Sequence, residues 1–160
     1  MKATSLFIPG IVLLFTLFST LSAHGQEIED YYALHKNDNG MESGIVPPKL
    51  ASLFVDEDYP DAIDVLKSLH SLKYLNYWGK GNEIHRYSSD AQHYKGSFDL
   101  LLQTTDKGRL VNIYGTEKKG TIRKVMVVVE TSSQFILLIG KGKLSHSQLN
   151  KLPELSKEIQ

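Results

Sequence analysis

Two almost purely apolar runs, Val125–Val129 and Phe135–Ile139, constrain the fold of this chain more than any other feature. A short polar segment separates them. Neither run can cross a bilayer, because a membrane helix needs roughly 20 consecutive apolar residues. Val, Ile and Phe dominate both runs, and this composition is typical of strands. We therefore predict that the two runs pair as an antiparallel hairpin near the centre of a sheet.

The hairpin has no polar alternation, so both of its faces should be dry, whereas antiparallel sheets commonly leave one face in water. One interpretation, which we favour, is that helices divide between the two faces, because large exposed apolar patches are rare on soluble monomers. The other is that one face packs on another chain. The residues of this candidate interaction face are Val125, Val127, Val129, Phe135, Leu137 and Ile139.

Strands follow each other through the second half of the chain. Residues 109–115, 121–130 and 135–144 read as three strands joined by turn-forming segments, which predicts a meander. Ser145 and Gln148 then have the spacing of a capping box, which opens a short C-terminal helix.

The first half alternates between helix and strand signals. Pro60 suits the first turn of a helix that continues to Leu69. In 71–78, Leu72, Tyr74 and Asn76 alternate with Lys73, Leu75 and Tyr77, as in a strand. An edge strand is allowed at Ile45-Val46, before Pro47-Pro48. Ser88 or Ser89 could cap a helix through "DAQHYKGSFDLLLQ", although Gly96 would lie in its middle.

Together these elements predict one α+β domain over residues 26–160. Its sheet is antiparallel or mixed, with about four to five strands, and it includes the C-terminal three-stranded meander. The helices pack on this sheet.

The N-terminus has the pattern of a secretory signal peptide over residues 1–25. Lys2 precedes an uncharged apolar stretch, 6–21, and small residues precede a cleavage site between Gly25 and Gln26. We expect export to the periplasm or secretion, although an uncleaved anchor is the alternative. The chain has no cysteine, so no acyl anchor can be attached.

Charge excludes two classes of partner. The full chain is neutral, with 18 basic and 18 acidic residues, and Lys2 is the one charged residue of the signal segment, so the mature net charge is −1. Such a chain has no electrostatic attraction for nucleic acid or for anionic lipid.

Ligand-type side chains form no recognisable cofactor or metal site. The acidic segments "DEDYPD" (56–61) and "NDNG" (37–40) both depart from the EF-hand pattern. No two histidines have the four-residue helical spacing of a zinc pair.

Ser88, Ser89 and His93 would be the centre of a serine hydrolase, but a helix cap is the simpler interpretation of the serines. Tyr74, Tyr77, Trp78 and Tyr87 surround a Gly-Lys-Gly turn and could offer rings to a sugar, although such aromatics are usually core.

The C-terminal segments "FDLLLQTTDKGRLVNIYG", "IRKVMVVVE" and "FILLIGKGKLSHSQLNKL" resemble an exported family of Bacteroidetes labelled domain of unknown function 4252. The recurring feature is a Leu/Ile-x-Gly-Lys strand end followed by a short polar-capped helix, here Leu138 to Leu152. The resemblance implies an α+β fold, an envelope location and an envelope-stress context, and it implies no catalytic residues. Many relatives look like lipoproteins, whereas this chain has His24 in place of the lipidated cysteine.

We therefore expect a non-catalytic interaction module that binds an envelope protein or a second copy of itself. A binder of a lipid or glycan fragment and a serine hydrolase are the alternatives.

Overall fold

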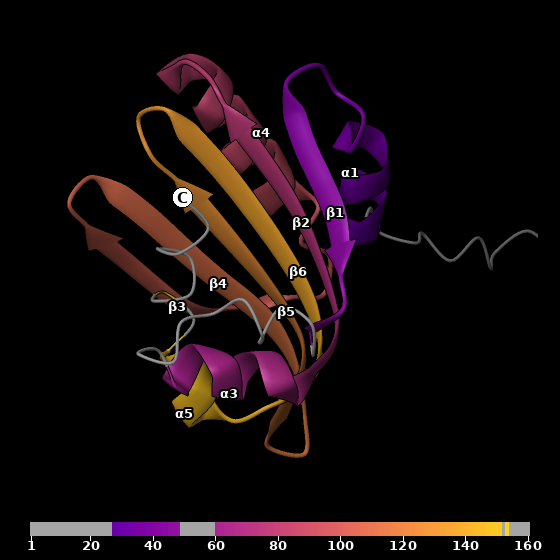
Figure 1. Cartoon of the computed structure of the whole chain (residues 1–160). Helices are drawn as coiled ribbons and strands as arrows, with labels where there is room; N and C mark the ends of the chain where they lie inside the picture. The colour runs from indigo at the N-terminus through magenta and orange to yellow at the C-terminus, as the bar shows by residue number, and fades with distance from the viewer. Residues whose placement is uncertain (1–26, 49–59, 152, 154–160) are drawn as a thin grey trace, which may run out of the picture.

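The structure is a computed structural model that describes residues 27–48, 60–151 and 153 (Figure 1). The signal peptide at 1–25, the cleavage site at Gly25 and Gln26, and the acids at 56–58 lie outside the described residues.

Six strands form one antiparallel sheet in the order β1-β2-β6-β5-β4-β3 (Figure 1). Their bounds are β1 Met41–Val46, β2 Leu69–Trp78, β3 Asp99–Asp106, β4 Arg109–Lys118, β5 Thr121–Glu130 and β6 Gln134–Leu144. The sheet is therefore larger than the four to five strands predicted, while its antiparallel character and the mixed α+β class are confirmed.

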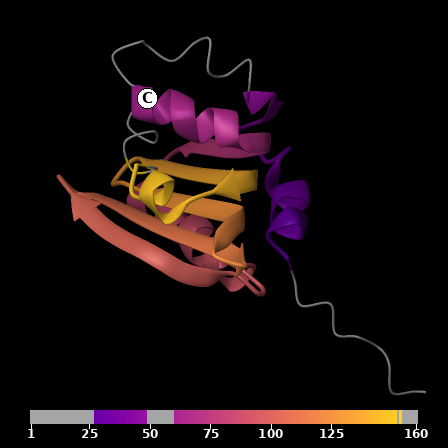
Figure 2. The same ribbon diagram turned by 90° about the horizontal axis from the view of Figure 1, so that it is seen from below.

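The helices of the described residues are short: α1 Ile28–His35, α3 Pro60–Ser68, α4 Gly81–His93 and α5 His146–Leu149. In Figure 1, α3 and α5 lie across the near face at the lower end of the sheet, and α4 lies behind it. Figure 2 shows α1 at the edge of the sheet beside β1. No helix in the described part of the chain has the length and apolarity needed to cross a membrane.

The chain reaches the two edges of the sheet in separate steps. β1 and β2 pair directly, with α3 between them in sequence. The segment with α4 then crosses behind the sheet to the far edge, and β3, β4, β5 and β6 return as a meander until β6 pairs with β2. The residue pairs Lys107-Gly108 and Lys119-Gly120 both have positive φ, as the tight turns of twisted hairpins require.

The predicted helix through "DAQHYKGSFDLLLQ" is wrong. The helix in this region is α4, which begins at Gly81 and ends at His93. Residues 99–106 form β3. Ile84, Tyr87, Ser88 and Ala91 are buried at helical spacing, but only one of them is a large aliphatic residue. Gly96 has φ +53, a conformation that ends helices, so it separates α4 from β3.

Two hydrophobic cores lie on opposite faces of the sheet. The first joins α3 and α5 to one face and contains Val65, Leu66, Leu69, Val111, Ile113, Ile122, Val125, Val127, Val129, Ile136, Leu138, Leu144 and Leu149. The second joins α1 and α4 to the other face and contains Ile28, Tyr31, Tyr32, Leu75, Ile84, Tyr87, Ala91, Phe98, Tyr114, Met126, Val128, Phe135, Leu137 and Ile139.

Glu29 fastens α1 to the sheet. Its carboxylate lies against the ammonium groups of Lys73 on β2 and, at 2.7 Å, of Lys141 on β6. Burial alone would raise the pKa of Glu29, but the two lysines outweigh it and hold the pKa below its usual value.

Candidate functional site

The six residues of the predicted interaction face lie on opposite faces of the sheet. The three valines belong to the core under α3 and α5, and the three β6 residues belong to the core under α1 and α4. None of the six is more than 3% exposed. The register explains the division: Glu130 pairs with Phe135, so over Val125–Val129 each odd-numbered residue of β5 pairs with an even-numbered residue of β6. These side chains are core residues, and helices of the same chain pack on both faces.

Trp78 is the most informative exposed side chain. Four large apolar residues of the described chain are exposed, namely Leu34, Ile45, Trp78 and Leu100. Single exposed aliphatic residues are ordinary. Trp78, however, is the one tryptophan of the chain and is 52% exposed. Tryptophan is enriched among the residues that dominate protein–protein binding energies.

Trp78 ends β2 at the end of the sheet away from α3 and α5 (Figure 1). Side chains alternate along a strand, so Trp78 lies on the same face as Tyr74, which packs against the α3/α5 core. Gln134 is the cross-strand partner of Trp78 on β6, and Glu42 is the partner of Asn76 on β1.

A ladder of amides connects these strands. The Nε2 atom of Gln134 donates to Oδ1 of Asn76 at 3.0 Å, and Nδ2 of Asn76 donates to Oε2 of Glu42 at 3.1 Å. Gln134 and Asn76 are buried, whereas Glu42 is exposed. The buried amides thus hold a carboxylate at the solvent boundary. We call the side chains of Glu42, Asn76, Trp78 and Gln134 the Trp78 surface.

The β5–β6 turn forms a rigid rim beside Trp78. The Oγ1 atom of Thr131 accepts hydrogen bonds from the backbone N–H groups of Ser133 and Gln134. The N–H of Gly79, which follows Trp78, donates to the carbonyl of Ser133 at 3.0 Å. Ser132 and Ser133 themselves are exposed.

A second polar cluster joins the end of α1 to α4. Nδ1 of His35 lies 2.7 Å from Oδ2 of Asp38, and the hydroxyl of Tyr87 donates to the same oxygen at 3.0 Å. The buried hydroxyl of Tyr31 donates to the carbonyl of Tyr87 at 2.9 Å. The hydrogen bond from His35 lowers the pKa of Asp38, and burial raises the pKa of Tyr87. The hydrogen bonds of this cluster hold the end of α1 against α4.

In the serine hydrolase alternative, neither the Ser88 hydroxyl nor the Ser89 hydroxyl bonds to a described histidine. Ser88 is buried in α4, where its Oγ accepts from Nε2 of Gln92 at 3.4 Å. Nδ1 of His93 lies 2.7 Å from the backbone oxygen of Ser89. Within residues 27–48, 60–151 and 153, no three metal-ligating side chains converge.

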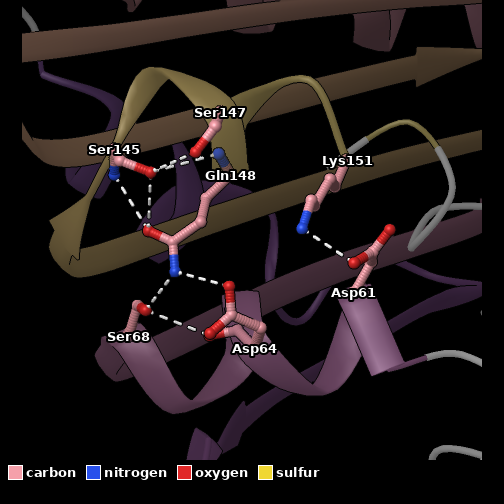
Figure 3. A network of polar contacts seen from close by, with 7 residues as sticks. All are labelled: Asp61, Asp64, Ser68, Ser145, Ser147, Gln148 and Lys151. Carbon is pink, nitrogen blue, oxygen red and sulfur yellow. Dashed lines mark hydrogen bonds and ion pairs between the residues drawn. The ribbon is translucent and has the colours of Figure 1, made fainter.

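Figure 3 shows the network that joins α5 to α3. The predicted capping box is confirmed, since Oγ of Ser145 accepts from the backbone N–H of Gln148 at 3.2 Å and Oε1 of Gln148 accepts from the N–H of Ser145 at 2.9 Å. The Nε2 atom of Gln148 then donates to Asp64 and Ser68 of α3, at 2.9 and 2.7 Å. Gln148 therefore caps one helix and attaches it to another.

Residues 31–152 match the family described as Domain of unknown function (DUF4252). This chain belongs to that family. The DUF4252 match confirms the family resemblance and runs from α1 to the residues after α5, so it contains both the Trp78 surface and the network of Figure 3. No curated protein and no solved structure matches the chain significantly.

Sequence reasoning noticed Trp78 but missed Glu42 and Gln134 of this DUF4252 domain. The alternation in β2 placed Asn76 on the face of Tyr74, and this was the one available signal. Glu42 and Gln134 come from strands 34 residues before and 58 residues after Asn76 in sequence. Only the strand order brings them together.

Proposed function

We propose that this chain is an exported protein-interaction module that binds a partner protein through the Trp78 surface, without catalysing a reaction. The observation that carries the proposal is the half-exposed Trp78 at the end of β2. A tryptophan in this position offers a large contact area with few rotatable bonds, which is why tryptophan dominates many protein interfaces.

The scaffold around Trp78 supports this role. Its strand pairs on both sides, with β1 and β6, and the neighbouring turn is held by hydrogen bonds from backbone N–H groups to the Thr131 hydroxyl and to backbone carbonyls. Little conformational entropy remains to be lost when a partner binds such a surface, and this lowers the cost of association.

The proposed compartment is the periplasm or the exterior of a Gram-negative cell of the Bacteroidetes group. Support comes from the signal-like residues 1–25 and from the exported relatives that the sequence resembles. The envelope-stress context belongs to the same proposal. Because the chain has no cysteine, we propose that it acts without an acyl anchor.

Site-directed photo-crosslinking in the native envelope tests the proposal. A benzophenone side chain at position 132, on the rim beside Trp78, should capture one reproducible partner. The same group at position 100, on the far edge strand, is the control, because Leu100 is also exposed. Equal capture from both positions would contradict the proposed surface.

The captured protein is then purified and its affinity measured by calorimetry. Trp78→Ala should weaken binding about 30-fold, the equivalent of about 2 kcal/mol for an interface anchor. Leu100→Ala is a matched control, because Leu100 is 53% exposed and Trp78 is 52% exposed. Unchanged affinity of the Trp78→Ala variant would refute the role of Trp78.

A further inference from the structure

Glu42 and Trp78 lie on the same face of the sheet and both reach solvent. Asn76 pairs with Glu42 across β1 and β2, and Trp78 is two residues further along β2. Trp78 is therefore a diagonal neighbour of Glu42, and such neighbours lie roughly 7–8 Å apart, within reach of long side chains. One bound group can contact both.

The carboxylate of Glu42 has no ion-pair partner among the described residues. Its hydrogen bond comes from Asn76, which is a neutral amide. None of the ion pairs in the described part of the chain involves Glu42, although Glu29, Asp38, Asp61, Glu117 and Glu130 each have a basic partner. The buried Gln134 bonds to Asn76 in turn and limits its rotation. The carboxylate of Glu42 is thus held in one orientation at the surface.

An oriented carboxylate beside an exposed indole is a combination that attracts cations. The face of a tryptophan ring binds cations better than any other aromatic side chain. A guanidinium group can also stack on a ring while its N–H groups bond to a carboxylate, which a compact ammonium group does less well. A neutral sugar would leave the charge of Glu42 unpaired.

We propose that Glu42 and Trp78 form an acceptor site for an arginine side chain from a basic segment of a partner protein. Asn76 and Gln134 are positioning residues, since they orient Glu42. This inference rests on the proposed function, because it specifies the chemistry of the partner at the Trp78 surface.

The single tryptophan makes the site directly observable, because all indole fluorescence of the chain comes from Trp78. The probe is an acetylated and amidated Gly-Arg-Gly peptide, titrated into the mature chain at low salt. The matched probe carries citrulline, which has the shape of arginine without its charge. The arginine peptide should change the fluorescence saturably, and the citrulline peptide should bind at least about tenfold more weakly, a difference that added salt reduces.

Glu42→Gln is the decisive variant, because a glutamine oxygen can still accept from Asn76 while the charge is lost. It should weaken binding of the arginine peptide at least about tenfold, and Asp99→Asn, at an exposed acid of β3, should leave it unchanged. Equal responses to the arginine and citrulline peptides would overturn the inference. So would wild-type affinity of the Glu42→Gln variant, or a saturable response to chitotriose in place of the arginine peptide.

Two experimental outcomes distinguish the arginine site from the proposed function as a whole. If the partner captured from position 132 requires Trp78 but binds the Glu42→Gln variant normally, the arginine site is refuted and the interaction module stands. If Trp78→Ala does not affect partner binding, the proposed function itself fails.

Discussion

Replacing Gly142 by alanine tests how closely α3 approaches the sheet. Gly142 lies on β6 opposite Leu69, the first residue of β2. A Cβ atom at Gly142 would lie 2.2 Å from the carbonyl oxygen of Ser68 and 2.7 Å from the Cα atom of Leu69. Both are backbone atoms, so no side-chain rotation can relieve the overlap. The junction of α3 with β2 must move away from β6.

The size of the effect follows from this geometry. Ordinary contacts of a Cβ begin at 3.4 Å, so the two backbones must separate by about 1 Å in a closely packed region. Overpacking costs about 1–3 kcal/mol, and a backbone clash belongs at the upper end of that range. Alanine offsets about 0.4–1 kcal/mol by restricting the unfolded chain. We expect a net loss of about 2 kcal/mol, which lowers Tm by roughly 5–10 °C for a domain of this size.

Urea and thermal unfolding, followed by circular dichroism, measure this loss. Gly81→Ala is the matched control, because a Cβ at Gly81 meets only the carbonyl oxygen of Ser132 at 3.7 Å, among its neighbours within 4 Å. That variant should be as stable as the wild type or slightly more stable. The reasoning is refuted if Gly142→Ala unfolds within about 0.5 kcal/mol of the wild type, or if both variants lose the same stability.

Three further predictions concern the polar clusters. The hydrogen bond from His35 lowers the folded-state pKa of Asp38, so its stabilising contribution is present above the unfolded-state pKa of about 3.9 and is lost as the pH falls through the lower folded value. Asp38→Asn should flatten the fall of the urea midpoint below about pH 4, and parallel curves would contradict this. Ser145→Ala removes the cap of α5 and should lower the free energy of unfolding by about 1 kcal/mol in urea titrations. A fluorophosphonate probe should not label Ser88 or Ser89, since neither hydroxyl bonds to a described histidine, and labelling at either would favour a hydrolase.

Much of the fold was predictable because its signals are local. Pro60 begins α3, the strand predicted at 71–78 lies within β2, and the three C-terminal strands lie where their apolar runs and turns placed them. The edge strand allowed at Ile45-Val46 lies at the end of β1, which is an edge strand before Pro47-Pro48. In each case the conformation depends on neighbouring residues, through φ restriction, capping or side-chain alternation.

The helix that was misplaced shows where local signals fail. α4 is largely polar and buries Ser88 and Ala91, so its inward face carries little hydrophobic contrast. The segment 99–106 contains three successive leucines, which suit a helix or a strand equally well when read alone. Pairing with β4 decides for the strand, because it satisfies backbone hydrogen bonds along an edge of the sheet.

By itself, the sequence determined the α+β class, the hairpin, the meander and the α5 cap, because each arises from contacts between residues close in the chain. Only the tertiary structure decided the strand order, the register of β5 against β6 and the site that follows from them. A shift of one residue in that register exchanges every side chain between the two faces. The pairing of β5 with β6 buried the six alternate hairpin residues in two separate cores. The pairing of β2 with β1 and β6 brought Glu42, Asn76 and Gln134 together beside Trp78.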